Sequence, residues 1–182
     1  MKGAMIMAKD FKVKDKITIE GARLMFRNFS GEEGQYNPKG QRNFCVLIDP
    51  DLAERLKDDG WNVKYLKPRE EEEEPQAYLQ VKVQFGKISP ICVLVTSKNK
   101  KKLNEEQIGM LDWVEIKNVD LIIRPYNYEL RDGTKGVKAY LKSIYVTIVE
   151  DELELKYRDV PDADNIPDSA VNSIGEFEDE LD

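Results

Sequence analysis

Hydrophobic and polar residues alternate along several segments of the chain, and this alternation predicts β-strands. The clearest case is the segment 77–85, in which Leu79, Val81, Val83 and Phe85 occupy the odd positions and polar residues or tyrosine occupy the even ones. A side-chain period of two places the two sets on opposite faces of a strand. We therefore expect one buried and one exposed face in this segment.

Further strands are predicted over 16–29, which is rich in β-branched and aromatic residues, over the apolar runs 43–48 and 90–97, and over 61–66, 113–130 and 135–149. Gly21 is expected to form a bulge in the first of them. A short helix is predicted after Asp49-Pro50, an N-cap followed by proline at the first helical position, and Gly60 ends it. A second short helix is expected over 104–111. Many strands with one or two short helices indicate an all-β barrel or sandwich.

The segment 113–149 predicts a long hairpin with its turn at Arg131-Asp132-Gly133-Thr134. A three-residue loop pairs even-numbered residues with even-numbered ones, whereas a two-residue loop pairs even with odd. Gly133, late in the loop, favours the three-residue type, in which glycine takes the left-handed conformation. One face of the hairpin then carries Arg124, Tyr126, Tyr128, Lys138, Tyr140 and Lys142.

Tyrosines interleaved with cations are what single-strand recognition needs, since bases stack on the rings and cations contact the phosphates. Tyr78 and Lys82 give the segment 77–85 a polar face of similar character. The alternative interpretation is an ordinary exposed sheet face, on which tyrosine and lysine are both common. We expect Trp61 and Trp113, which begin strands, to lie in the core.

The segment 16–42 carries a second cluster of rings and cations. Phe26 shares parity with Ala22 and Leu24 and is predicted to be core. The opposite parity gives an exposed face with Arg23, Arg27 and Phe29 as candidate contacts. The glycine-rich segment 30–41 is predicted to be a long mobile loop. Extended to residue 42, it is expected to act as a flap that adds Tyr36, Lys39 and Arg42. In the alternative interpretation this loop is merely solvated.

The lysines between 98 and 102 predict a basic turn, in which Lys100 and Lys101 are candidate phosphate contacts. Basic runs of this kind also serve solubility alone. The acidic run Glu70 to Glu74 is interpreted as a solvated loop.

Charge is distributed unevenly along the 182 residues, whose formal net charge is −7. Residues 158–182 hold nine acidic residues and one arginine, a net charge of −8, whereas the preceding residues are close to neutral. Prolines and scattered apolar residues in this segment predict disorder. We therefore expect a flexible N-terminus over 1–15, one domain over 16–157 and a disordered acidic tail over 158–182.

The composition excludes several classes of enzyme. The chain contains no histidine, so serine or cysteine nucleophiles activated by histidine are excluded. Cys45 and Cys92 lie in apolar runs and are expected to be buried thiols. The acids Asp49, Asp51 and Glu54 are explained by helix capping, and nothing supports a second group, Glu115 and Asp120. No catalytic residue, metal site or cofactor is predicted.

No apolar run approaches the ~20 residues that span a bilayer. The apolar stretch near the N-terminus is too short for the core of a signal peptide. We therefore expect a soluble protein of the bacterial cytoplasm that makes no membrane contact.

Several longer segments resemble the small single-stranded DNA-binding proteins of tailed bacteriophages and prophages. They are IEGARLMFRNFSG (19–31), QRNFCVLID (41–49), DGWNVKYLKPRE (59–70), YLQVKV (78–83), NVDLIIRPY (118–126) and KAYLKSIYVTI (138–148). The resemblance covers roughly residues 17–160. It implies an oligonucleotide-binding (OB) barrel, sequence-tolerant DNA binding and a role in phage replication or recombination.

Together, these observations predict a non-enzymatic single-stranded DNA-binding protein with an elaborated OB-like barrel. The acidic tail is expected to compete with DNA or to recruit replication or recombination proteins, and a homodimer is left open. Two other hypotheses are kept: a phage structural or assembly protein that makes only protein contacts, and a metal-dependent nuclease.

Overall fold

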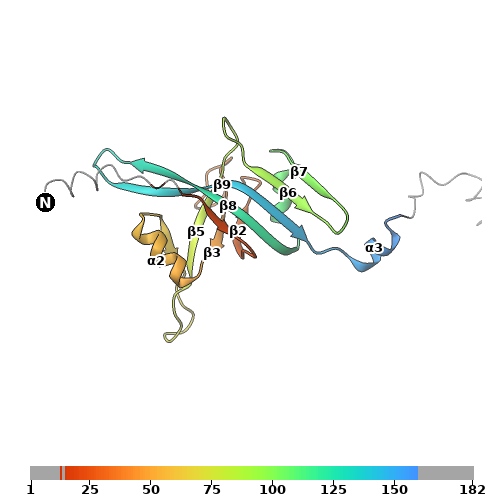
Figure 1. Ribbon diagram of the computed structural model, residues 1–182, viewed down its shortest axis with the longest axis horizontal. Coiled ribbons are helices and arrows are strands. Elements are labelled where there is room, and N and C mark those ends of the chain that lie inside the picture. Colours follow the sequence, from red (N-terminus) through yellow and green to blue (C-terminus); the bar gives the residue numbers. More distant parts are fainter. Residues whose placement is uncertain (1–12, 14, 160–182) are drawn as a thin grey trace, which may run out of the picture. The chain divides into compact units, whose positions relative to one another are not determined.

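The computed structural model describes residue 13 and residues 15–159, which fall into two units (Figure 1). The first unit ends at Val149 and the second begins at Glu150. Most of the predicted flexible N-terminus and of the predicted disordered tail lies outside the described residues.

The first unit is built mainly of β-strands, which confirms the predicted fold class. Its strands are β1 (Ile17–Ile19), β2 (Leu24–Asn28), β3 (Arg42–Leu47), β4 (Val63–Tyr65), β5 (Ala77–Val83), β6 (Ile91–Val95), β7 (Lys100–Leu103), β8 (Ile116–Glu129) and β9 (Lys135–Ile148). Its described helices are α2 (Pro50–Asp58) and the 3₁₀ helix η1 (Ile108–Asp112). Asp49 caps α2 as predicted, accepting a hydrogen bond from the Leu52 amide at 2.8 Å.

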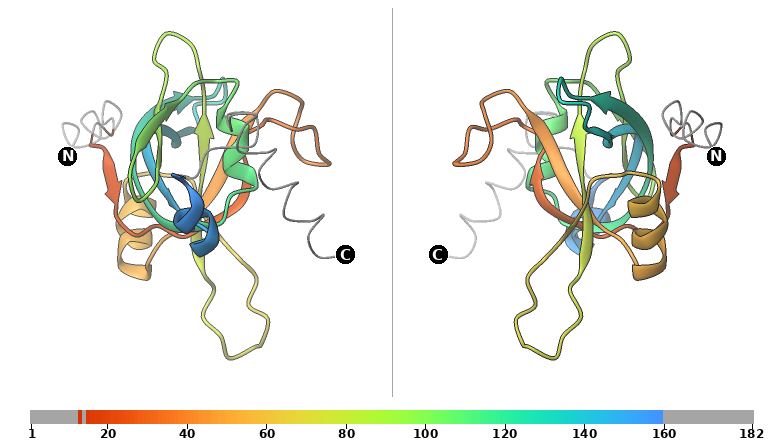
Figure 2. Two further views of the ribbon diagram at one scale, coloured as in Figure 1. Left: turned by 90° about the vertical axis from the view of Figure 1, so that its right-hand side faces the viewer. Right: turned by 90° about the vertical axis from the view of Figure 1, so that its left-hand side faces the viewer.

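The strands form one curled sheet in the order β1-β8-β9-β5-β3-β2. The two ends of this path, β1 and β2, are successive pieces of the single predicted strand 16–29. The chain bends between them at Gly21, which has φ +62° and donates its amide hydrogen to Asp120 Oδ1. The two end strands of the sheet are therefore joined by the few residues around Gly21, and the sheet curls into the ring that Figure 2 shows.

Strand β9 holds two other strands along one edge. Residues 139 and 140 of β9 pair with β5, and residues 143–147 pair with β6, in both cases in parallel. Its other edge pairs with β8 along the hairpin. The inner part of the hairpin thus belongs to the sheet, and the turn end projects beyond β5.

The core lies inside the curl. Phe29 and Phe44 are fully buried, with ring centroids 5.0 Å apart, and Trp61 is buried as predicted. Burying one such side chain contributes about 1.5–3 kcal/mol. These residues come from β3 and the ends of β2 and α2, so they hold the sheet in its curled form.

The predictions for the two phenylalanines of the segment 16–29, Phe26 in the core and Phe29 exposed, are both wrong. Phe29 is buried, whereas Phe26 is 67% exposed. The pairing of β2 with β3 shifts by one residue between Met25 and Asn28, and Phe26 has φ +49°. This β-bulge reverses the parity of every residue beyond it, and the prediction from simple alternation is therefore wrong here.

Two further expectations are wrong. Trp113 is 80% exposed, because it follows η1 in an irregular turn before β8 begins. The predicted basic turn is partly a strand, since Lys100 to Leu103 form β7 against β6.

The second unit contains the short helix α3 (Glu152–Tyr157) within its described residues. Asp151 caps it by accepting a hydrogen bond from the Leu153 amide at 2.7 Å, and Arg158 pairs with Glu150. No helix among the described residues of either unit has the length and apolar character needed to cross a membrane.

Candidate nucleic-acid interface

The turn of the β8–β9 hairpin has the three-residue geometry that the sequence predicts. The Gly133 amide donates to Leu130 O at 2.9 Å, and the Leu130 amide donates to Thr134 O at 2.7 Å. Gly133 has φ +90°, the left-handed conformation that this loop requires. Even-numbered residues therefore pair with even-numbered ones on this part of the hairpin, which confirms the predicted register.

This register places rings and cations on one side of the hairpin, which we call the outer face because the opposite side packs into the core. Arg124 lies opposite Tyr140, and Tyr126 lies opposite Lys138. The rings of Tyr126 and Tyr140 are 5.2 Å apart and tilted by 52°. The guanidinium of Arg124 lies 4.9 Å from the Tyr140 ring, so charges and rings are held against each other.

Tyr128 completes the hairpin part of the outer face. It lies opposite Gly136, and a Cβ at Gly136 would lie 2.4 Å from the Tyr128 hydroxyl oxygen. The ring therefore lies across the glycine backbone. Lys138 Nζ is 5.1 Å from the same ring. The absence of a side chain at Gly136 leaves space for the ring, and the ammonium group of Lys138 lies against one side of it.

Strand β5 continues the outer face on the other side of β9. Lys82 is in register with Tyr140, and Tyr78 and Gln80 share its parity, whereas Leu79 and Val81 point into the core. The polar face predicted for this strand thus joins the hairpin face. The predicted residues of β5, β8 and β9 form one continuous surface.

A second bulge adds a residue that sequence reasoning missed. The register shifts between Ile122 and Ile123 of β8, and Lys142 is the extra residue on β9. Beyond this point odd-numbered residues of β9 face outward, so Tyr145, which is 43% exposed, lies on the outer face. Uninterrupted alternation from Lys138, Tyr140 and Lys142 would place an odd-numbered residue on the opposite side. No glycine marks this bulge in the sequence.

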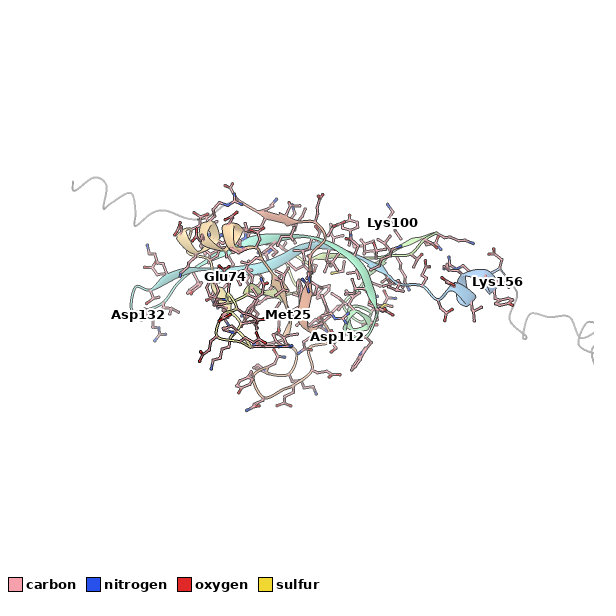
Figure 3. The ribbon with its side chains drawn as sticks, turned by 90° about the horizontal axis from the view of Figure 1, so that it is seen from below. Met25, Glu74, Lys100, Asp112, Asp132 and Lys156 are labelled. Atoms are coloured by element: carbon pink, nitrogen blue, oxygen red, sulfur yellow. The ribbon has the colours of Figure 1, made fainter. Side chains whose placement is uncertain are left out.

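Strand β7 extends the surface further, with Lys100, one of the two lysines predicted, and with Lys102 in place of Lys101. Lys102 pairs with Val93, which pairs in turn with Tyr145, and Lys100 shares its parity. Lys101 has the opposite parity, that of the buried Leu103. Figure 3 shows Asp132 at the turn end of the hairpin and Lys100 towards the other end of the sheet.

Two lysines of the outer face have lowered pKa values. Desolvation, followed by the charge of Lys138, lowers the pKa of Lys82. A hydrogen bond from Lys16 and its charge lower the pKa of Lys142. Lys16, also missed from the sequence, therefore lies beside the β9 bulge. Cations that repel one another in this way favour an anionic partner.

Three residues of the predicted first-strand cluster are not on an open face. Phe29 is in the core. Arg27 is half-buried, and its Nη1 donates to the carbonyl oxygens of Leu111 and Val114, both at 2.9 Å. Arg42 shares the parity of buried Phe44 and pairs with Glu105 at 3.2 Å. The bulge in β2 explains the positions of Phe29 and Arg27. Arg42, predicted to belong to the flap, is the first residue of β3.

Arg23, Tyr36 and Lys39 are exposed, as predicted. Tyr36 and Lys39 lie in the 30–41 loop, where the Asn37 side-chain amide donates to three carbonyl oxygens, those of Glu32, Pro38 and Gln41. The loop thus has internal hydrogen bonds of its own. Its predicted action as a flap stays a prediction.

The two cysteines are buried thiols in the part of the chain that the structure describes. Burial raises the pKa of the Cys92 thiol to about 12, and burial also raises that of Cys45. Both cysteines are unpaired and buried, as predicted. The described residues hold no group of three or more acids or cysteines close enough to bind a metal ion.

Comparisons with known proteins point to one family. The model of the phage single-stranded DNA-binding domain family matches residues 7–180. No protein among those with curated descriptions matches the chain.

Solved structures of phage proteins resemble the fold. The single-stranded DNA-binding protein of bacteriophage Enc34, in complex with ssDNA, aligns with a TM-score of 0.50 at 14% identity, covering 78% of this chain and 94% of that one. The same phage protein in a second structure gives 0.48 at 15% identity, over 84% and 97% of the two chains. Protein gp2.5 of bacteriophage T7 gives 0.40 at 11% identity, over 85% and 99%. The first of these likenesses supports the predicted OB-like fold.

Proposed function

This chain belongs to the phage single-stranded DNA-binding domain family, and we propose that it binds single-stranded DNA, without sequence preference, across the outer face. The observation that carries the proposal is the packed set of rings and cations on β8 and β9. Tyr126 and Tyr140 lie side by side, with Arg124 and Lys138 against the tyrosine rings of this face.

Each element of the face has a role in this proposal. Bases stack on the tyrosine rings, which contributes about 1–3 kcal/mol per base and is tolerant of sequence because every base has a π-face. Lys82, Lys142 and Lys100 lie along the same surface and contact phosphates. Counterion release makes the affinity fall as salt rises. The solved complex of the Enc34 protein with ssDNA supports this type of ligand for the fold.

The proposal includes a role in phage DNA replication or recombination in the host cytoplasm, without catalysis. The acidic segment 158–182 competes with DNA for the cationic face or recruits partner proteins. Its charge of opposite sign to the outer-face cations supports this part. Deleting residues 158–182 is expected to tighten binding of oligo-dT at low salt. Unchanged or weaker affinity would rule out competition by the tail.

The test of the outer face is the double variant Tyr126→Ala with Tyr140→Ala. Loss of two stacking rings is expected to weaken oligo-dT binding by about 2 kcal/mol or more, measured by fluorescence anisotropy at about 50 mM salt. The matched control is Tyr65→Ala, which removes a 45% exposed tyrosine beside Lys57. This control should bind as the parent protein does.

Circular dichroism of the double variant shows whether the sheet is intact. A folded variant with unchanged affinity would contradict the proposed surface. A parent protein with no affinity for oligo-dT at about 50 mM salt would favour the assembly-protein hypothesis. Cleavage of the oligonucleotide on adding Mg²⁺ would favour the nuclease.

A further inference from the structure

Phe26 has a strained backbone conformation, and its side chain is not buried in compensation. Its φ of +49° is one that residues with a Cβ rarely adopt, at a cost of about 1–2 kcal/mol. The side chain is 67% exposed, so burial offsets little of this cost. A strained, exposed aromatic residue indicates a functional constraint.

A network of hydrogen bonds fixes the backbone around Phe26 to the turn that carries Trp113. Arg27 Nη1 donates hydrogen bonds to the carbonyl oxygens of Leu111 and Val114. In return, Asp112 accepts from the Phe29 amide at 2.6 Å and from the Ser30 hydroxyl at 2.6 Å. Figure 3 labels Met25 and Asp112, the residues immediately before Phe26 and Trp113, near each other.

Both aromatic side chains are therefore presented to solvent from an immobilised backbone. Trp113 lies in the middle of the network and is 80% exposed. Exposed large apolar groups on a rigid frame are typical of binding sites rather than of ordinary surface.

A hollow of about 420 Å³ lies beside these residues, and its charge indicates the kind of ligand. Its walls are residues 21–24 and Arg27 on one side and residues 115–119 on the other. Arg23, Arg27 and Lys117 line it together with one acid, Glu115. Phe26 is adjacent to Arg27, and Trp113 is two residues from Glu115. The hollow thus has a net positive charge, and two exposed aromatic residues lie close in sequence to residues of its walls.

We propose that this hollow and its two rings form a second nucleotide-binding site, in which bases of single-stranded DNA stack on Phe26 and Trp113 and phosphates contact Arg23 and Lys117. This inference rests on the proposed function and extends it beyond the outer face. Positive charge beside exposed rings matches a single-stranded nucleic acid. A protein contact is the competing outcome, and the experiments below separate the two.

The second site lies at the end of β8 that is far from the hairpin turn. One of its walls includes Ile116 to Val119 at the start of β8, and the Ala22 amide donates to Val119 O at 2.7 Å across the two walls. Lys117 and Arg124 are seven residues apart on the same strand, about 23 Å at the ordinary rise per residue. A DNA strand that occupies both sites therefore runs along β8. It would need a long oligonucleotide, about 30 nucleotides being ample for one such domain.

The two tryptophans provide a direct readout. Trp61 is 4% exposed and Trp113 is 80% exposed, so bound bases can stack only on Trp113. Oligo-dT of about 30 nucleotides is expected to quench the tryptophan fluorescence of the parent protein. The variant Trp113→Phe should lose this quenching, because only the buried Trp61 remains. Equal quenching in parent and variant would overturn the proposal.

The variant Phe26→Gly separates binding from stability. Glycine adopts φ +49° without strain, so the thermal midpoint should not fall, whereas affinity for the long oligo-dT should fall about tenfold. The control Phe26→Tyr keeps the ring and should bind with nearly the parent affinity.

Two results would overturn the second site while leaving the proposed function intact. One is parent affinity in Phe26→Gly alongside weakened binding in the Tyr126→Ala, Tyr140→Ala variant. The other is a change in sedimentation of Phe26→Gly with unchanged DNA affinity, which would assign the rings to a protein contact. If instead the Tyr126→Ala, Tyr140→Ala variant keeps the parent affinity, while Phe26→Gly loses it, the result contradicts DNA binding at the outer face.

Discussion

The β8–β9 hairpin and the β2 strand carry the same kind of sequence, with rings and cations at alternating positions, yet they differ in how far alternation predicts their faces. In the hairpin, the even-numbered residues from Arg124 to Tyr140 share the outer face as predicted. In β2, alternation assigned Phe29 to solvent and Phe26 to the core, and the structure has the reverse.

The difference lies in where each segment is irregular. The hairpin changes direction at a loop that contains Gly133, and a glycine in such a loop marks the left-handed position in the sequence. In β2 the left-handed position is occupied by Phe26, which gives no such signal. Alternation therefore predicts faces only between irregularities, and a bulge at a non-glycine residue is invisible to it.

The largest expected effect comes from replacing Phe29 with alanine, for which the matched comparison is the same replacement at Phe26. Phe29→Ala removes a fully buried ring stacked on Phe44 and should lower the free energy of unfolding by about 3–5 kcal/mol. Phe26→Ala removes an exposed ring and should change it by less than about 1 kcal/mol. Urea unfolding measures both values. Similar losses in the two variants would contradict the reversed assignment.

A smaller effect is expected from the two arginines of the same strand. Arg27→Ala leaves the carbonyl oxygens of Leu111 and Val114 without their shared donor and should cost about 1.5–3 kcal/mol. Arg23→Ala, at an exposed position, serves as the control and should cost under about 0.5 kcal/mol. Urea unfolding gives both values, and equal costs would mean that the network does not stabilise β2.

In the hairpin, a smaller change tests the support beneath Tyr128. Gly136→Ala introduces a Cβ about where the ring lies and should displace the ring from Lys138. We expect oligo-dT affinity to fall by about 0.5–1 kcal/mol, because one stacking surface is misplaced. The control is Gly86→Ala, where the added Cβ meets no atom within 4 Å. Parent affinity in Gly136→Ala would exclude Tyr128 from the interface.

The smallest effect concerns the lysine that joins the hairpin to β5. Since the pKa of Lys82 is lowered in the folded state, its charge opposes folding at neutral pH. This penalty fades as pH rises from the lowered pKa to the ordinary value of 10.5. Lys82→Met should therefore raise the thermal midpoint slightly at pH 7 and lose this advantage above about pH 10.5.

The same variant should bind oligo-dT more weakly, with a shallower dependence on salt, because one phosphate contact is lost. Gln80→Met, on the same face of the same strand, is the uncharged control. A lower midpoint for Lys82→Met at pH 7 would show that the lysine stabilises the sheet instead.

The sequence predicted the features that depend on neighbouring residues. The Asp49 cap, the β5 alternation and the Gly133 turn are all local, and all are confirmed. The positions of Tyr145 and Lys100 depend on pairing between distant segments, namely a bulge at Lys142 and the alignment of β7 on β6. Local periodicity carries no information on such pairings.

The role of β9 as the common partner of β5, β6 and β8 has a consequence for how the chain is made. Both parallel pairings join strands that are far apart in sequence. The pairing with β5 needs residues 139 and 140 of β9, and the pairing with β6 needs residues 143–147. Such non-local topologies fold slowly, over milliseconds to seconds. During synthesis, β5, β6 and β8 must therefore each wait with an unpaired edge until β9 has left the ribosome.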